Sequence, residues 1–206
     1  ELTMRSIPST PPRLEELSIE QEILDSAFPD RGLVLVTGTV GTGKSTLLAS
    51  MLRHIRETQR RKIVTFEHPI EFDLMNIPNS KGPLVQTSIP EHLSGFDITP
   101  RNAMRRAVDV MLVGESRDRD TLWGMLEAAE TGVVAYSTVH TQSVADTPTR
   151  IINVFSADMQ QQVASTLLAS LRLVVQQRLE QSPQGGRVPI KEYLVFNRSV
   201  RDQLIQ

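Results

Sequence analysis

The chain has 206 residues, of which 39% are hydrophobic and 4% aromatic, which suits one large domain with a mainly aliphatic core. Its formal net charge of −2 provides no general attraction to nucleic acid or acidic lipid. The lack of cysteine excludes disulfides and thiolate metal sites. No apolar run approaches the ~20 residues of a membrane-spanning helix, so we expect a cytosolic globular domain with no transmembrane segment.

The first elements precede the main pattern. Residues 1–13 hold three prolines and no apolar periodicity, which indicates a linker or an extended arm. Leu14 to Phe28 has the apolar spacing of an amphipathic helix, and its glutamates are read as the solvated face of that helix.

From Arg31 onward, short continuous apolar runs alternate with helical patterns. Such runs predict strands that are buried on both faces, at Gly32–Val36, Ile63–Phe66, Val110–Val113 and Val133–Val139. Helices are expected at Ser45–Glu57, 99–107, 118–130 and 143–154. Alternation of buried strands with helices predicts an α/β fold with a mainly parallel sheet and helices on both faces.

The remaining segments differ from this pattern. Residues 73–98 contain several prolines and glycines and are predicted to form a long loop with at most one short strand. A helix is expected near 158–171. The runs 173–179 and 188–196, joined by Ser-Pro-Gln-Gly-Gly, predict a C-terminal β-hairpin.

The segment between the first strand and the first long helix reads Gly-Thr-Val-Gly-Thr-Gly-Lys-Ser and matches the P-loop pattern without a mismatch. Its glycines allow backbone N–H groups to surround phosphates at a helix N-terminus. The Lys44 ammonium is expected at the β- and γ-phosphates of ATP, and the Ser45 hydroxyl on Mg²⁺. The predicted nucleotide-binding residues are Gly38, Thr39, Val40, Gly41, Thr42, Gly43, Lys44, Ser45 and Thr46.

Carboxylates follow two of the predicted strands. Glu115 comes just after Val110–Val113, where an acid can reach Mg²⁺ or its water; the alternative is that it caps the next helix. Glu67 and Glu71 follow Ile63–Phe66, where one carboxylate can activate an attacking water. An ordinary surface turn remains the alternative for this pair.

His140 ends the strand Val133–Val139 and is a candidate hydrogen-bond donor to the γ-phosphate, although a lone histidine is often structural. Arg101, Arg105 and Arg106 share a helical stretch, and Arg117 follows Glu115. These arginines are candidates for phosphate contacts or for fingers that reach a neighbouring subunit. Solvated salt bridges are the alternative reading.

Together these motifs resemble the secretion and pilus-motor ATPases of type II and type IV systems. Gly38–Ser45 looks like the Walker A motif of that family, Glu67–Phe72 (EHPIEF) like its acidic box, and Val110–Asp118 (VMLVGESRD) like its Walker B motif. Thr131–Thr141 (TGVVAYSTVHT) resembles its histidine box, and Met4–Pro8 (MRSIP) its interdomain linker. The resemblance extends over nearly the whole chain and implies a RecA-like P-loop fold.

The resemblance also implies roles for single residues. Glu71 is the expected water-activating base, Glu115 serves Mg²⁺, and His140 contacts the γ-phosphate. Arg101 and Arg105 match basic positions before the Walker B strand. Two departures are notable: His68 stands where an aspartate is usual, and Val133 where the histidine box often has its first histidine.

The same resemblance predicts the organisation and biology of the protein. Residues 1–13, including Arg5, are expected to be a linker remnant from a missing N-terminal domain, and 14–206 the motor domain. The implied function is a hexameric Mg²⁺-dependent ATPase, cytoplasmic and peripheral to inner-membrane secretion or transfer proteins. Details such as the loop 73–98 look most like the Dot/Icm-type (type IVB) branch and its conjugative relatives.

Two other functions are kept beside this one. The first is a RecA-type DNA-translocating or helicase-like ATPase, although the near-neutral charge and the lack of a basic-aromatic stretch argue against direct nucleic-acid binding. The second is a nucleotide-regulated binding module that hydrolyses slowly. DNA stimulation of the ATPase rate would favour the first, and bound nucleotide without turnover the second.

Overall fold

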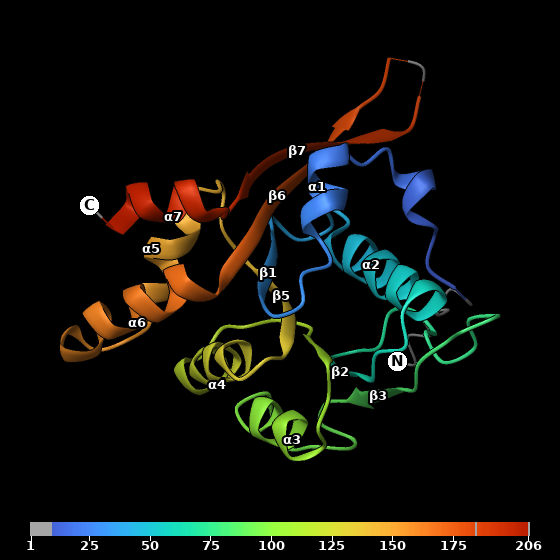
Figure 1. Ribbon diagram of the computed structural model, residues 1–206. Coiled ribbons are helices and arrows are strands. Elements are labelled where there is room, and N and C mark those ends of the chain that lie inside the picture. Colours follow the sequence, from blue (N-terminus) through green and yellow to red (C-terminus); the bar gives the residue numbers. More distant parts are fainter. Residues whose placement is uncertain (1–9, 184, 206) are drawn as a thin grey trace, which may run out of the picture.

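The computed structural model describes residues 10–183 and 185–205, without the side chains of 204 and 205 (Figure 1). One seven-stranded sheet has the order β3-β2-β4-β5-β1-β6-β7. All neighbouring strands are parallel except the antiparallel pair β6–β7. The strands are β1 (Gly32–Thr37), β2 (Ile63–Glu67), β3 (Leu84–Ser88), β4 (Val110–Val113), β5 (Val134–Val139), β6 (Leu171–Gln181) and β7 (Arg187–Val195).

Helices cover both faces of this sheet (Figure 1). They are the 3₁₀ helix η1 (Leu14–Leu17) and the α-helices α1 (Gln21–Ser26), α2 (Lys44–Thr58), α3 (Thr99–Arg105), α4 (Arg119–Glu130), α5 (Asp146–Ile152), α6 (Ala157–Ser170) and α7 (Arg198–Ile205). The predicted α/β fold with a mainly parallel sheet is confirmed.

Strand β1 shows why the apolar runs are continuous. Successive strand residues point to opposite faces, so Leu33 and Leu35 join one core cluster while Val34 and Val36 join the other. The first cluster is completed by α3, α4, α5 and α6, and the second by η1, α1 and α2. Each fully buried leucine or valine contributes roughly 1.5–3 kcal/mol, which holds both helical layers against the sheet.

The predicted helix over Leu14–Phe28 is wrong in detail, because it is interrupted. Ser18 adopts a left-handed conformation with φ 47° and ends η1 before α1 begins. Lys191 of β7 holds this turn by donating to the Ser18 carbonyl at 3.0 Å and pairing with Glu20 at 3.3 Å. The turn that interrupts the helix is therefore held by a long-range contact that periodicity does not encode.

Other boundaries agree or differ by a few residues. The loop 73–98 contains one short strand, β3, as predicted, and it pairs with β2 at the sheet edge. The helix expected over 143–154 is shorter, since α5 covers only Asp146–Ile152. Helix α7 was not predicted.

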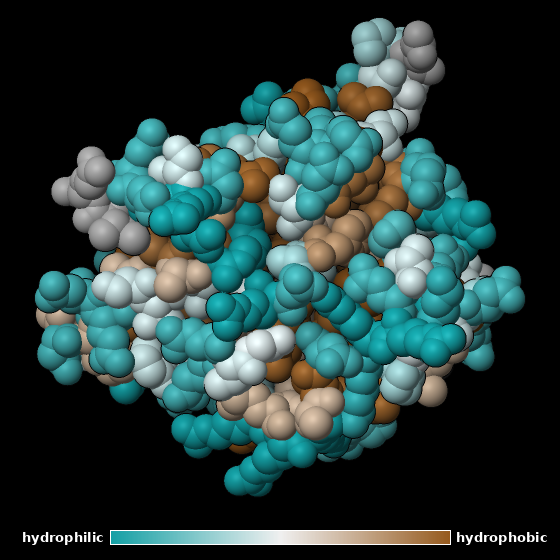
Figure 2. Space-filling model, viewed as in Figure 1, coloured by the Kyte–Doolittle hydropathy of each residue, from teal (hydrophilic) through white to brown (hydrophobic). Residues whose placement is uncertain are grey.

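The predicted C-terminal hairpin is confirmed as β6–β7, and its outer end projects from the body of the molecule (Figure 1). Figure 2 shows a largely hydrophilic surface with hydrophobic side chains along this hairpin, where Val188 and Ile190 are more than one-third exposed. Within residues 10–183 and 185–205 no helix has the length and apolar character needed to cross a membrane. Arg5 and most of the predicted linker 1–13 lie outside the described residues.

Candidate functional site

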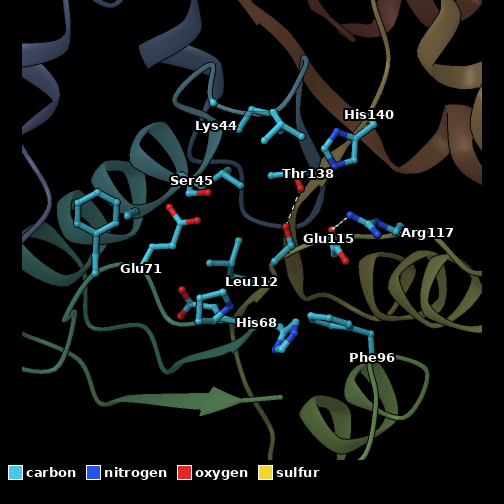
Figure 3. A pocket seen from close by; sticks show the side chains of 18 residues that line it. Lys44, Ser45, His68, Glu71, Phe96, Leu112, Glu115, Arg117, Thr138 and His140 are labelled. Atoms are coloured by element: carbon cyan, nitrogen blue, oxygen red, sulfur yellow. Dashed lines mark hydrogen bonds and ion pairs between the residues drawn. The ribbon is translucent and has the colours of Figure 1, made fainter. Parts of the chain in front are cut away.

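A pocket of about 240 Å³ lies at the carboxyl ends of β1, β2, β4 and β5. In parallel α/β sheets ligands bind at this end of the strands. Each strand is followed by at least one predicted residue (Figure 3): Lys44 and Ser45 follow β1, Glu71 follows β2, Glu115 follows β4 and His140 follows β5. The structure therefore brings together residues that are up to about a hundred positions apart in the sequence.

The loop after β1 has the shape of a phosphate cradle. Gly38 and Gly43 have φ angles of 137° and 85°, values that side chains with a Cβ rarely adopt. Lys44 is the first residue of α2 and is only 7% exposed. Its Nζ donates to the carbonyl oxygens of Gly38 at 2.9 Å and Thr39 at 2.7 Å. The ammonium is thus held across the loop, at the end of a helix whose dipole attracts anions.

Strand β6 supports this loop from behind. Gln177 is buried, and its Nε2 donates to the Thr42 carbonyl at 2.6 Å. A Cβ at Gly38 would lie 2.3 Å from the Gln177 carbonyl oxygen, so glycine is required there for this packing. Sequence reasoning missed Gln177, because a glutamine in an alternating strand carries no motif signal.

Hydroxyl groups of β5 fix the loop that carries Glu115. Thr138 Oγ1 donates to the Gly114 carbonyl at 2.6 Å, and Ser137 Oγ to the Val113 carbonyl at 2.7 Å. The Glu115 side chain is 30% exposed and pairs with Arg117 at 2.7 Å. Because its backbone is tied to β5, Glu115 is held beside the phosphate loop (Figure 3).

The electrostatics around Lys44 and His140 follow from burial. Desolvation lowers the pKa of Lys44, and the negative charges of Glu71 and Glu115 partly offset this. Desolvation, with the positive charges of Lys44 and Arg117, lowers the pKa of His140. Since an ordinary histidine already titrates below neutral pH, His140 is a neutral imidazole at pH 7. In that form the ring has one N–H group that can donate a hydrogen bond.

The two glutamates after β2 have different environments. Glu67 accepts hydrogen bonds from Thr65 Oγ1 at 2.5 Å and Gln86 Nε2 at 3.1 Å, and burial raises the pKa of its carboxyl group. The Glu71 carboxylate accepts no hydrogen bond and forms no ion pair within the described part of the chain, and it points toward Ser45 (Figure 3). The geometry favours Glu71 as the reactive carboxylate and Glu67 as a structural one.

The arginines fall into two groups. Arg117 lines the pocket and pairs with Glu115. Arg101 and Arg105 lie exposed on α3 and do not line the pocket. In this conformation neither residue therefore contributes to the pocket of its own chain.

Comparison with protein families identifies the chain. A family model described as "Type II/IV secretion system protein" matches residues 4–201. The chain belongs to this family. Its pocket is thus that of a type II/IV secretion system protein, as the motifs at Gly38–Ser45 and at Thr131–Thr141 predicted.

Relatives of this type II/IV secretion family include pilus proteins. A twitching motility protein of Neisseria gonorrhoeae is 44% identical over 203 residues, which is 96% of this chain and 52% of the relative. The type IV pilus retraction ATPase PilT of Pseudomonas aeruginosa is 40% identical over 199 residues, covering 96% and 57%. The chain thus spans about half the length of the curated relatives it matches.

Solved structures agree with this assignment. The ATPase DotB of Legionella pneumophila superposes with a TM-score of 0.95 at 41% identity, over 98% of this chain and 55% of that one. The pilus retraction motor PilT with bound ADP gives a TM-score of 0.91 at 36% identity, over 97% and 57%. The family resemblance predicted from the sequence is confirmed.

A separate hollow of about 220 Å³ lies next to the phosphate loop, on the side of the β6–β7 hairpin. Its lining is mainly apolar, with Leu47 of α2, Leu179 and Pro189 of the hairpin, and Leu17 of η1. Gly43, Thr46 and Gln177 connect it to the phosphate loop. Such a surface suits a flat heterocycle that is attached to phosphates.

Proposed function

We propose that this chain hydrolyses ATP with Mg²⁺ as the motor domain of a secretion or pilus ATPase. The observation that supports the proposal is the convergence of Lys44, Glu71, Glu115 and His140 on one pocket around a phosphate loop. The family includes proteins named as ATPases, which agrees with this chemistry.

The phosphates are bound by the loop from Gly38 to Thr46. Its backbone N–H groups and the N-terminus of α2 attract the β- and γ-phosphates. When nucleotide binds, the Lys44 ammonium exchanges the Gly38 and Thr39 carbonyls for phosphate oxygens. Those carbonyls hold the ammonium in place beforehand, so little reorganisation is needed.

The residues fit a magnesium site. The Ser45 hydroxyl lies in the pocket and has no hydrogen-bond partner in the described part of the chain, and Glu115 lies opposite it (Figure 3). Magnesium is usually held by one or two protein oxygens together with phosphates and water. When bound, the ion would neutralise phosphate charge; the Ser45 hydroxyl would hold it directly and Glu115 would hold it through water.

Hydrolysis requires a base and a donor for the γ-phosphate. Glu71, whose carboxylate is free and faces Ser45, accepts the proton of the attacking water. Neutral His140 donates a hydrogen bond to the γ-phosphate on the opposite side. Glu67 keeps the turn after β2 in place through Thr65 and Gln86.

The adenine base occupies the apolar hollow beside the hairpin. Leu17, Leu47 and Leu179 supply the surfaces on which a purine ring packs, and Thr46 lies between this hollow and the phosphate loop. Because Lys191 ties Ser18 to β7, the position of Leu17 over the base depends on the hairpin.

The finer assembly is part of the proposal. We infer a hexamer in which Arg101 and Arg105 reach the site of a neighbour, because both are exposed and outside their own pocket. The motor acts in the cytoplasm on inner-membrane secretion or transfer proteins. The likeness to DotB supports the type IVB branch, while the pilus relatives keep pilus retraction as the competing role.

The test is ATP turnover and binding in wild type and Lys44→Ala. Removing the ammonium held in the phosphate loop should abolish tight binding of a fluorescent ATP analogue and all turnover. Unchanged affinity in Lys44→Ala would place the nucleotide elsewhere. Turnover that depends on single-stranded DNA would favour a RecA-type DNA translocase over a secretion motor.

A further inference from the structure

A cavity of about 440 Å³ lies beside the nucleotide pocket. The two spaces share a wall, since Arg117 and His140 line both. The rest of the cavity is formed by Leu122 of α4, Val139 of β5, and by α5 with the residues that follow it. Figure 3 shows Arg117 and His140 together on one side of the nucleotide pocket.

The polar groups of this cavity suit an anion. Arg117 and Arg150 contribute guanidinium groups and Asn153 an amide, whereas no carboxylate lines it. The side chains of Arg150 and Asn153 have no hydrogen-bond or ion-pair partner in residues 10–183 and 185–205. The hydroxyl of Ser116 is already engaged with Ser137 at 2.7 Å. The available donors are therefore the Arg150 guanidinium and the amide N–H groups of Asn153.

We propose that this cavity binds inorganic phosphate after ATP hydrolysis, before the ion leaves the protein. The proposal rests on the proposed ATPase function. The γ-phosphate is expected beside His140 and Arg117, so a released ion needs to pass only these two side chains to enter the cavity. Guanidinium groups bind phosphate oxygens through paired N–H donors.

The ion pair between Arg117 and Glu115 is the contact that phosphate has to replace when it enters the cavity. Arg117 is paired with Glu115 at 2.7 Å, and 67% of its side chain is exposed. Exposed ion pairs contribute little, about 0–1 kcal/mol, so a phosphate dianion competes readily with Glu115 for the guanidinium. Arg150 and Asn153 are exposed, so the cavity is open to solvent on their side, while the buried Val139 and Ile151 form its apolar wall.

The experiment measures phosphate binding while the nucleotide site is filled. The protein is saturated with an ATP analogue that has an imido β–γ bridge, and radiolabelled phosphate binding is measured by equilibrium dialysis at constant ionic strength. We expect phosphate binding to persist in wild type and to weaken at least about tenfold in Arg150→Ala, because one charge-assisted contact is lost. Arg198→Ala, which removes a 93% exposed arginine side chain of α7, should bind as wild type.

Two results would overturn the proposal. Loss of phosphate binding when the analogue is added would show that phosphate binds only in the nucleotide site. Equal affinity in Arg150→Ala and wild type would exclude the cavity.

If Arg150→Ala misfolds, Arg150→Lys and Asn153→Ala test the same contacts. If the analogue itself does not bind, the ATPase proposal fails, and phosphate titration of wild type against Arg150→Ala still tests the cavity.

Discussion

The Nε2 of Gln177 donates a hydrogen bond of 2.6 Å to the carbonyl oxygen of Thr42, and so joins strand β6 to the phosphate loop. Both partners are buried. In a buried setting an unpaired carbonyl costs about 1–3 kcal/mol, so this contact favours the loop conformation in which the N–H groups remain free for phosphate.

Gln177→Ala is therefore expected to weaken ATP binding about tenfold, because the Thr42 carbonyl loses its donor. The maximal turnover rate should change less, since Gln177 does not line the phosphate pocket. Titration with a fluorescent nucleotide and steady-state kinetics measure the two effects. Gln181→Ala, at the exposed end of the same strand, is the matched control. An unchanged affinity in Gln177→Ala would show that the loop needs no support from β6.

Glu71→Gln should keep ATP and Mg²⁺ binding but lower turnover about 10²–10⁴-fold, the usual effect of losing a general base. Glu67→Gln should lower turnover less, because its carboxylate is occupied by Thr65 and Gln86. The two variants form a matched pair for single-turnover assays. If Glu67→Gln is the inactive one, the base is assigned to the wrong carboxylate. Lost metal affinity in Glu71→Gln would make Glu71 a magnesium ligand instead.

Glu67→Gln is also expected to change the pH dependence of stability. Burial raises the pKa of Glu67, so the folded state binds this proton more tightly than the unfolded chain does. Stability is then lost as the pH rises from the ordinary glutamate range, near 4.5, through the raised pKa. A neutral glutamine avoids this loss.

Urea unfolding measures this effect. The free energy of unfolding of Glu67→Gln should exceed that of wild type at pH 8, and the difference should shrink as the pH falls toward 4.5, the ordinary value. A difference that is independent of pH would mean that the Glu67 carboxyl group has the same pKa in the folded and the unfolded state.

Arg101→Ala or Arg105→Ala should depress turnover of the assembled protein while nucleotide affinity of dilute protein stays unchanged. The reason is that both side chains lie outside their own pocket, and an arginine that stabilises the transferring phosphoryl group is worth about 10³–10⁵ in rate. Mixing either variant with Lys44→Ala protein tests the shared site, since mixed assemblies should recover part of the activity. No recovery at any ratio, with a rate independent of protein concentration, would assign both arginines to their own chain.

The sequence predicted the parts of the site that lie within short motifs. The phosphate loop and the four central strands are local patterns, because strands buried on both faces must be continuously apolar. The parts that could not be predicted depend on contacts between distant segments. Gln177 reaches Thr42 across 135 positions, and Lys191 reaches Ser18 across 173. Neither contact leaves a periodicity or a spacing that can be read from one chain.

The two glutamates after β2 show the same limit on a smaller scale. Their spacing left open which one is reactive, and the family resemblance pointed to Glu71. In the structure Gln86, which lies 19 positions away on β3, donates to Glu67, and this contact agrees with the choice of Glu71. The hydrogen bond that occupies Glu67 therefore comes from β3. The sequence predicted at most one short strand in this segment, with no partner for it.

The sheet also determines which parts of the site can adjust to different nucleotides. Strands β4, β5 and β1 are neighbours in the sheet and fully buried. Glu115, His140 and the phosphate loop each follow one of these strands. The strand ends from which they start are therefore held about 4.8 Å apart from one strand to the next. Changing these separations would require breaking backbone hydrogen bonds in the core. The turn that carries Glu71 extends beyond β2 and is only partly buried. Under the proposed ATPase function, we therefore expect adjustment between ATP and ADP in segments outside the central strands, such as this turn.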